Sequence, residues 1–300
     1  MNELDSIKIS FSPNGLLLLN IILGFILFGI ALELKKSDFT SLIYNKKTTL
    51  IGLSAHFLVL PLLTFALVKL LHPPPSVALG MILVGACPGG NMSNMFTHIA
   101  KGNTALAVGL TSLSHVLAII MTPFNFSFYG SLDPETADLL KTIHLDVFDV
   151  FQTIILVICI PLIAGITFNY YKPLLAEKMS VLMKRFSLAA FAFFLIAAFA
   201  SNAKIFTGNF ITIIPLVIIH NAVALGGGFV FAWLLRLPLR DIKTITFETG
   251  IQNSGLGLIL IFTFFNGLGG MALVAASWGV WHLISGGVLA FYWSKTTPAA

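Results

Sequence analysis

The chain has 300 residues, of which 57% are hydrophobic and 10% are charged, and its formal net charge at pH 7 is +5. The mean hydropathy is +0.95. This composition excludes an ordinary soluble domain and is typical of a protein that crosses a membrane several times. The two cysteines, Cys87 and Cys159, lie in apolar segments, so we expect from them neither a disulfide nor a metal site.

Apolar segments recur along the whole chain, and each is long enough to cross a hydrocarbon layer of about 30 Å as a helix. The nine predicted spans are residues 13–34, 48–71, 76–99, 103–127, 146–170, 186–203, 209–235, 242–265 and 270–293. The connections at 101–103 and 205–209 are too short for a separate domain, while the longest loop, 128–145, is expected to hold an interfacial turn of helix. We therefore predict an all-α membrane protein with one membrane domain over residues 1–300.

The basic residues predict the orientation of the chain, because short cytoplasmic loops collect Lys and Arg. When the loops are assigned alternately to two sides, most of the 17 basic residues fall on the side of the C-terminus. The other side holds only Lys8, Lys69, Lys141 and Lys204. We expect a multi-pass protein of the cell (inner) membrane with an uncleaved N-terminus outside and the C-terminus in the cytoplasm. Topology and attraction to anionic lipids explain the net charge without a nucleic-acid partner.

Two of the predicted spans contain residues that interrupt a helix. The third span includes GACPGGNMSNMFTH at 85–98, where Pro88 removes a backbone donor and two glycines weaken the helix. The eighth span includes TFETGIQNSGLGLIL at 246–260, which is also rich in glycine. Unwound backbone inside a membrane must be covered by protein or line a cavity, and in transporters it forms ion and substrate sites. We therefore predict that the two breaks supply the polar groups of a binding site.

Glu248 is the only acid placed well inside a predicted span, and an ionised carboxylate at the centre of a helix costs about 2.5–3.5 kcal/mol. This cost favours a counter-charge for a bound cation or proton, and a protonated structural glutamate is the alternative. His56 and His220 precede the two breaks at similar distances along the chain. This similarity suggests an inverted repeat, in which substrate binds between paired broken helices.

Four segments, CPGGNMSNMFTHIAKGN, TSLSHVLAIIMTP, FETGIQNSGLGLIL and WHLISG, resemble the signature segments of the bile acid:sodium symporter family in order and spacing. The chain resembles a bacterial member of the nine-span form. The resemblance implies an inverted-repeat transporter with two crossing broken helices, a core domain and a panel domain. The core would comprise spans 48–71, 76–99, 103–127, 209–235, 242–265 and 270–293, and the panel spans 13–34, 146–170 and 186–203. Such a protein would carry an organic anion, bile acid-like or a small carboxylate, by sodium-driven alternating access.

The same resemblance implies two sodium sites and one substrate site. The first sodium site would comprise Ser93, Asn94, Thr111 and Glu248. The second would comprise Glu248, Gln252, the backbone carbonyls of Thr249 and Ile251, and the position of His56. The substrate site would comprise Asn91, Asn253 and His282. Sodium is a hard cation that suits neutral oxygens with one carboxylate, and we expect no catalytic residue and no cofactor other than the coupling ion.

Two positions depart from the family pattern and leave the coupling ion open. Ala107 has no side-chain oxygen where the family commonly has a serine, and His56 stands where the family commonly has a glutamine. Imidazole is a poor sodium ligand, but it titrates near physiological pH. A proton, or a single sodium, could therefore replace the second sodium, unless His56 is a structural histidine between helices. His282 has the same structural alternative.

An intramembrane enzyme and an ion channel are the rival classes of function. The chain contains no His-Glu-x-x-His, no paired aspartates and no Gly-x-Ser-x-Gly, so we do not expect an enzyme. Broken helices also build channel filters, which keeps a channel as an alternative to a carrier. His98, His115 and His220 are expected to be structural.

Overall fold

The computed structural model describes residues 5, 21, 22, 24–29, 31, 32 and 42, and then residues 45–142, 147–201 and 203–296. Within residues 142–211, side chains are described only at 159–183, 185, 186, 189 and 193. Most of the first predicted span, 13–34, therefore lies outside the described residues. The described backbone is mainly helical, and an isolated antiparallel β-bridge joins Gly89 and Gln252.

The helices follow one another through short connections. They are α4 (Lys46–Ser54), the π-helical turn η1 (Ala55–Val59), α5 (Leu60–Leu71), α6 (Pro75–Ala86), α7 (Met92–Ile99), α8 (Thr104–Leu132), α9 (Pro134–Thr142), α10 (Val147–Tyr171), α11 (Pro173–Ser201), α12 (Ala203–Leu234), α13 (Leu239–Gly250), α14 (Ser254–Phe264) and α15 (Gly269–Thr296). Among the described residues, four continuous helical stretches have the length and composition to cross a membrane: Lys46–Leu71, Thr104–Leu132, Thr212–Leu234 and Gly269–Thr296. These findings confirm the prediction of an all-α chain with several membrane-spanning helices.

Both predicted helix breaks are confirmed. The first separates α6 from α7 at residues 87–91, and the second separates α13 from α14 at residues 251–253. Cys87, the first residue after α6, has an extended backbone, as does Ile251 after α13. A helix of 12 residues is about 18 Å long, which is less than the membrane core, so neither half of a broken helix spans the bilayer alone.

A π-helical turn lies in the middle of the helix that runs from Lys46 to Leu71. Pro61 has no backbone N–H, so the carbonyl of Phe57 lacks its usual partner four residues later. The side chain of Asn125 from α8 donates to this carbonyl at 2.9 Å. Single π-turns are frequent at functional sites, and this one carries His56.

Some of the predicted boundaries are wrong. Helix α11 begins at Pro173, well before the predicted span at 186, because Lys178, Lys184 and Arg185 interrupt the apolar pattern but are good helix formers. The predicted connection at 205–209 lies inside α12, and α8 continues to Leu132 instead of ending at 127. The expected turn of helix in the longest loop is confirmed as α9.

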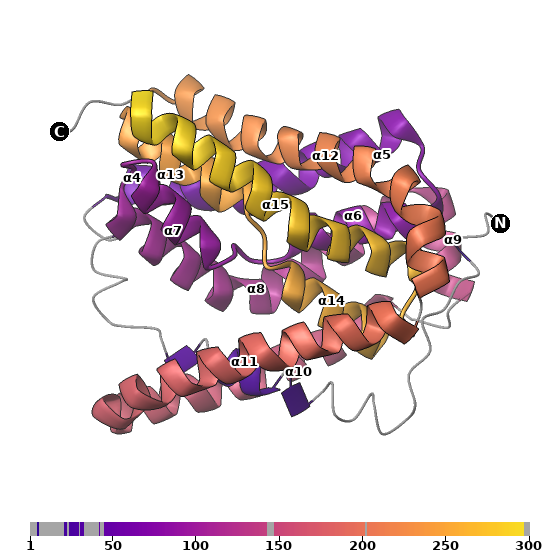
Figure 1. Ribbon diagram of the computed structural model, residues 1–300, viewed down its shortest axis with the longest axis horizontal. Helices are drawn as coiled ribbons and strands as arrows, with labels where there is room; N and C mark the ends of the chain where they lie inside the picture. The colour runs from indigo at the N-terminus through magenta and orange to yellow at the C-terminus, as the bar shows by residue number, and fades with distance from the viewer. Residues whose placement is uncertain are drawn as a thin grey trace.

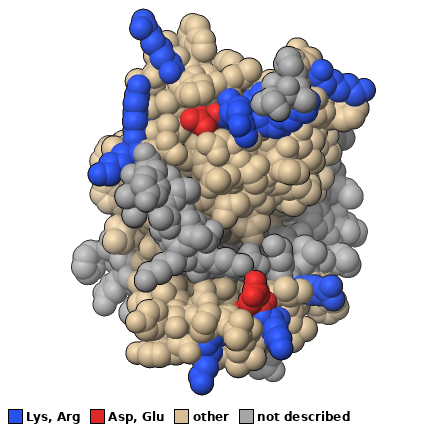
Figure 2. Space-filling view, turned by 90° about the vertical axis from the view of Figure 1, so that its left-hand side faces the viewer, with Lys and Arg blue, Asp and Glu red and all other residues tan. Residues whose placement is uncertain are grey.

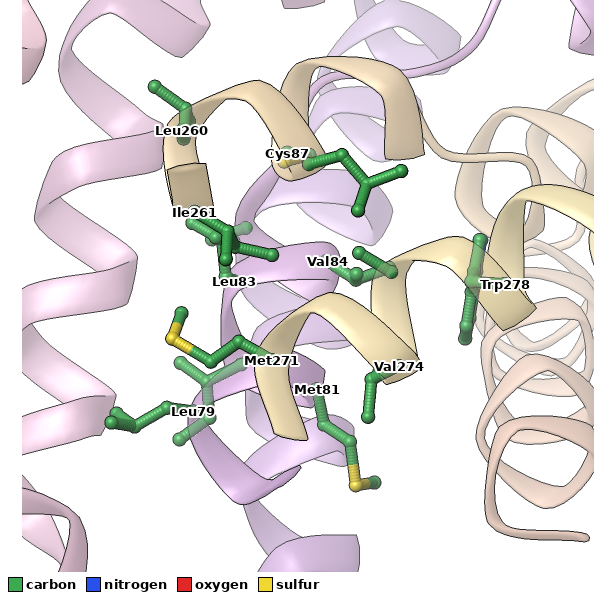
Figure 3. Close-up of a cluster of buried hydrophobic side chains, with 14 of the residues drawn as sticks. Leu79, Met81, Leu83, Val84, Cys87, Leu260, Ile261, Met271, Val274 and Trp278 are labelled. Atoms are coloured by element: carbon green, nitrogen blue, oxygen red, sulfur yellow. The ribbon is translucent and has the colours of Figure 1, made fainter. Parts of the chain in front are cut away.

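The apolar core holds α6, α14 and α15 together. Figure 1 shows α11 along one side of the molecule, α12, α13 and α15 on the opposite side, and α6 and α14 between them. Nearly every residue of α6 is buried, and α6 packs against α15 and α8. Figure 3 shows the side chains of this core, which include Leu79, Met81, Leu83, Val84 and Cys87, Leu260 and Ile261, and Met271, Val274 and Trp278. This packing fixes α6 and α14, the halves that meet the breaks from one side.

The other two halves, α7 and α13, are fixed to each other by a polar clamp. Asn103, in the turn after α7, donates its amide to Asp241 at 2.8 Å, and its backbone N–H donates to the hydroxyl of Thr244 at 2.9 Å. The ammonium group of the buried Lys243 donates to the carbonyl of Ala100 at 2.7 Å. The two breaks are thus held between an apolar core and a polar clamp.

Candidate functional site

The two breaks face each other and are joined by backbone hydrogen bonds. The N–H of Gly90 donates to the carbonyl of Ile251, and the N–H of Asn253 donates to the carbonyl of Pro88, both at 2.8 Å. Between these bonds lies the antiparallel bridge of Gly89 and Gln252. The unwound segments therefore satisfy part of each other's backbone, as non-helical backbone at membrane depth requires.

Other helices satisfy the carbonyls that the breaks release. Four such contacts are Thr122 Oγ1 to the Ala86 carbonyl (2.7 Å), His56 Nε2 with the Cys87 carbonyl (3.0 Å), His56 Nδ1 with the Glu248 carbonyl (3.2 Å) and Asn221 Nδ2 to the Gly250 carbonyl (2.8 Å). The side chains come from α8, η1 and α12. The breaks are thus built into the fold by partners from three neighbouring elements.

The carboxyl group of Glu248 lies in the middle of this arrangement and is 1% exposed. Its Oε2 accepts hydrogen bonds from the hydroxyls of Thr111 at 2.7 Å and Ser93 at 2.9 Å. The two hydroxyl oxygens are 3.3 Å apart, and that of Thr111 is 3.1 Å from Oδ1 of Asn94. The structure therefore brings together all four residues predicted for the first cation site.

Helix α8 supplies a further hydroxyl that the sequence analysis missed. Ser114 lies one turn after Thr111 and places its Oγ 3.3 Å from Oε1 of Glu248. The same Oγ accepts the N–H of Gly89 at 3.3 Å. Ala107, one turn before Thr111, is fully buried and offers only a methyl group. The spacing of Thr111 and Ser114 in TSLSH was the signal available in the sequence, since residues three apart share a helix face.

The residues of the predicted second cation site lie beside the first. The amide nitrogen of Gln252 donates to the carbonyl of Thr249 at 2.7 Å, and the carbonyl of Ile251 is occupied by Gly90. Oε1 of Gln252 is buried and has no hydrogen-bond partner among the described residues. An amide oxygen that is buried without a donor is costly, so it is suited to a ligand that brings positive charge.

His56 lies at the second predicted site between two acceptors. Both of its ring nitrogens face a backbone carbonyl, one from each broken helix, and the ring is 1% exposed. A neutral imidazole has one N–H and can donate to one of these carbonyls, whereas an imidazolium can donate to both. His56 therefore joins the two breaks through their backbone carbonyls.

The three predicted substrate residues lie at the edge of this cluster. Asn91 and Asn253 immediately precede α7 and α14, and Oδ1 of Asn253 accepts the N–H of Leu256 at 3.0 Å as a helix cap. His282 lies on α15, and its Nδ1 is buried and has no hydrogen-bond partner in the part of the chain that the structure describes. Among the described residues, no hydrogen bond connects the side chain of Asn91 or His282 with the hydroxyls around Glu248.

Helix α15 approaches the second break through glycines, which places His282 near it. A β-carbon at Gly279 would lie 2.9 Å from Oγ of Ser254, and one at Gly286 would lie 2.8 Å from the side chain of Ile251. His282 stands between these two positions, on the same face of α15. Small residues allow such close helix packing in membrane proteins.

His115, which was expected to be structural, lies between the two groups of residues. Its Nδ1 is 2.7 Å from the carbonyl of Thr111, so this nitrogen carries the proton. Its Nε2 then faces the amide nitrogen of Asn253 at 3.5 Å. His115 therefore supports the positions of Thr111 and Asn253.

The donor set suits a hard monovalent cation. It combines one carboxylate with hydroxyl, amide and backbone oxygens, which is the chemistry that hard cations prefer. The N-termini of α7 and α14 also point at the breaks, and helix N-termini attract anions. The crossing can thus hold a cation and an anion side by side.

Comparisons with known proteins identify the family of this chain. Residues 20–209 match the Sodium Bile acid symporter family. The chain is 34% identical to the protein named uncharacterized sodium-dependent transporter YocS of Bacillus subtilis (strain 168) over 277 residues, which cover 92% of this chain and 83% of that protein. It is 33% identical to the probable sodium/metabolite cotransporter BASS1, chloroplastic, of Arabidopsis thaliana, and 29% identical to the protein of that name in Oryza sativa subsp. japonica. These matches cover 91% and 92% of this chain, and 65% and 66% of the plant proteins. The match over more than half of the chain shows that this protein belongs to the sodium bile acid symporter family.

Proposed function

We propose that this protein is a sodium-driven symporter that carries a small organic anion by alternating access. The observation that carries the proposal is the buried carboxylate of Glu248, which is surrounded by hydroxyl oxygens where two broken helices cross. A buried charge requires a partner of opposite charge, and the described residues form no ion pair with Glu248. The names of the bacterial and plant relatives, as sodium-dependent or sodium/metabolite transporters, support sodium as that partner.

In this proposal the two cation sites share Glu248. The first site consists of Ser93, Asn94, Thr111 and Glu248. The second consists of Glu248, Gln252, the carbonyls of Thr249 and Ile251, and the region of His56. The unpartnered Oε1 of Gln252 supports the second site, because a sodium ion would give this oxygen the positive partner that it lacks.

The substrate is an organic anion, bile acid-like or a small carboxylate, that binds beside the cations. Asn91, Asn253 and His282 are its proposed contacts. Asn91 is exposed and Asn253 is half-buried, so ligand can reach the start of both second half-helices. The positive ends of α7 and α14 favour a carboxylate there, and the unpartnered Nδ1 of His282 offers a further polar contact.

The proposed architecture has nine spans, an inverted repeat, a core of the spans at 48–71, 76–99, 103–127, 209–235, 242–265 and 270–293, and a panel of the remaining three. The packing of α12 on α13 and α15, and of α6 on α15 and α8, supports one core body, while α10 and α11 lie along its side. Movement of core against panel would expose the site to each side of the membrane in turn.

We propose that the end of the molecule where α4 begins and α15 ends faces the cytoplasm. Figure 2 shows Lys and Arg side chains spread over this end, with few acids. Six exposed basic residues lie on α4, in the turns before α8 and α13, in the first turn of α13 and at the end of α15: Lys46, Lys47, Lys101, Arg236, Arg240 and Lys295. An excess of basic residues marks the cytoplasmic side and leaves the N-terminus outside.

A proton, or a single sodium, is the second candidate for the coupling scheme, and His56 favours it. Two carbonyls face the two ring nitrogens at 3.0 and 3.2 Å, and only a protonated ring donates to both. A proton bound at His56 would take the place of one sodium. The schemes are separated by uptake into proteoliposomes, measured first under a sodium gradient without a pH gradient and then under a pH gradient without a sodium gradient. Uptake that responds to sodium alone, and equally in His56→Gln, would exclude the proton.

The main proposal is tested by uptake of radiolabelled bile acids and small hydroxy or keto acids, after a thermal-shift screen with and without sodium chloride. We expect saturable uptake that requires a sodium gradient and is lost in Glu248→Ala. The exposed Glu135→Ala, outside the predicted spans, is the matched control and should transport normally. Full uptake by Glu248→Ala would refute the ion role, and single-channel currents would favour a pore over a carrier.

A further inference from the structure

We propose that Ser114 is an additional oxygen ligand of the cation bound at Glu248. This inference rests on the proposed function and deepens it, because it adds a side chain to the first cation site. Positions 107, 111 and 114 share one face of α8, at spacings of four and three residues. The first is Ala107, which has no side-chain oxygen, so the side-chain oxygens at these three positions belong to Thr111 and Ser114.

The two carboxyl oxygens of Glu248 have different surroundings. Ser93 and Thr111 both lie against Oε2, whereas Ser114 lies against Oε1 at 3.3 Å. Ser114 is thus the side chain that provides a hydroxyl on the Oε1 side among the described residues. A cation that contacts both carboxyl oxygens, or that lies nearer Oε1, needs an oxygen at this position.

The hydroxyl of Ser114 can orient so that its lone pairs face a cation. Its single proton has two acceptors, the carbonyl of Thr111 at 2.9 Å and Oε1 of Glu248 at 3.3 Å. When the hydroxyl donates to the Thr111 carbonyl, the lone pairs of Ser114 Oγ face Glu248. Without a cation this arrangement places two oxygens in repulsion, and with a cation it becomes favourable.

The spacing of the oxygens also fits a shared ion. A hard cation of calcium or sodium size lies about 2.4 Å from each oxygen, so neighbouring ligands at right angles are about 3.4 Å apart. Ser114 Oγ and Glu248 Oε1 are 3.3 Å apart, as are the hydroxyl oxygens of Ser93 and Thr111. Ser114 is 1% exposed, so water does not compete for its lone pairs from bulk solvent.

Ser114 also connects the cation with the first break. Its Oγ accepts the N–H of Gly89 at 3.3 Å, two residues before the proposed substrate contact Asn91. A cation bound by Ser114 Oγ would therefore contact the same oxygen that accepts the N–H of Gly89. Removal of the hydroxyl should lower the affinity for sodium directly, and the affinity for substrate indirectly.

The experiment compares Ser114→Ala with Ser127→Ala in the full-length protein. Both serines lie on α8, and Oγ of Ser127 is buried and forms no hydrogen bond with the described residues, so this variant controls for loss of a buried hydroxyl. Thermal unfolding and uptake are measured against sodium chloride, with choline chloride to keep the ionic strength constant. We expect the half-saturating sodium concentration to rise about tenfold in Ser114→Ala and to stay unchanged in Ser127→Ala.

Further variants separate a ligand from a structural serine. Ser114→Cys keeps the size but replaces oxygen by sulfur, a poor ligand for sodium, so it should raise the sodium requirement even if Ser114→Ala folds badly. The double variant Ala107→Ser with Ser114→Ala should recover part of the affinity. A folded Ser114→Ala or Ser114→Cys protein with unchanged sodium dependence would overturn the assignment of Ser114. The proposed function itself fails if uptake and thermal unfolding of the unaltered protein do not respond to sodium, or if the response persists in Glu248→Ala.

Discussion

Gly89 lies directly against the carboxyl group of Glu248, which joins the first break to the buried acid of the second. A β-carbon at position 89 would lie 2.8 Å from the carboxyl carbon and 3.2 Å from Oε2, and closer still to Oε1. Gly89→Ala must therefore displace either the carboxylate or the break. We expect loss of sodium-dependent uptake and a decrease of about 1–3 kcal/mol in the free energy of unfolding.

Gly226→Ala in α12 is the matched control for this substitution, because nothing lies within 4 Å of a β-carbon built there. It should leave uptake unchanged, and alanine is the better helix former. Both variants are compared by sodium-dependent uptake and by thermal unfolding in detergent. Normal uptake by Gly89→Ala would show that the contact does not set the position of Glu248.

Asn221 is expected to stabilise the second break. Its Nδ2 donates to the carbonyl of Gly250 at 2.8 Å, and its Oδ1 accepts the hydroxyl of Ser285 at 2.6 Å. Asn221→Asp replaces the donor by an oxygen, so the buried carbonyl of Gly250 would face a second acceptor. The free energy of unfolding should decrease by about 1–3 kcal/mol, and uptake should be weaker. Asn266→Asp, at an exposed residue outside the breaks, should change neither, and equal behaviour of the two variants would contradict this role.

The sequence allowed the two breaks to be predicted because their causes are local. Pro88 removes a backbone donor, and the glycines around it and around Ile251 weaken the helices, whatever surrounds them. The residue types beside the breaks, above all Glu248, also indicated an ion site. The grouping of Ser93, Asn94 and Thr111 with Glu248 came from a family resemblance, and the structure brings these four together.

The partners that complete the breaks could not be predicted, because they depend on how distant helices are rotated. Asn221 lies in an apolar helix where a polar residue has no distinguishing local pattern, and only packing brings it to Gly250. The spacing of Ser114 and Thr111 places both on one helix face, but only packing brings that face to Glu248. The early start of α11 was missed for the opposite reason. Its first turns contain charged residues, so a prediction from hydropathy starts the span later than the helix begins.

Lys243 is expected to stabilise the clamp between α7 and α13. It is fully buried, its Nζ donates to the carbonyl of Ala100 at 2.7 Å, and the ammonium lies 5.6 Å from the ring centre of Trp293. Lys243→Met keeps the length of the side chain but leaves the carbonyl at the end of α7 without this donor. Thermal unfolding should show a decrease of about 1–3 kcal/mol in the free energy of unfolding. The exposed Lys47→Met should have no effect, and an equally stable Lys243→Met protein would contradict the clamp.

Asp133 should make the stability of the end of the molecule that carries α9 depend on pH. Its Oδ2 accepts a hydrogen bond from Lys69 at 2.6 Å, and its Oδ1 accepts the backbone N–H groups of Glu135 and Thr136 at the start of α9. Partial burial raises the pKa of Asp133, but the Lys69 ammonium and the two amides outweigh it, so the pKa lies below its ordinary value of 3.8. The ionised form is thus favoured in the folded protein.

A carboxyl group with a lowered pKa contributes stability above the pKa of the unfolded chain, and this contribution is lost as the pH falls through the lower folded value. At pH 7 we therefore expect Asp133→Asn to lower the free energy of unfolding by about 0.5–1 kcal/mol, because the amide can still cap α9 but loses the charge pair with Lys69. The difference should shrink once the pH falls below 3.8. Thermal unfolding of both proteins from neutral to acidic pH measures it, with the exposed Asp138→Asn as control. A difference that stays constant over this range would show that ionisation of Asp133 does not stabilise this end of the molecule.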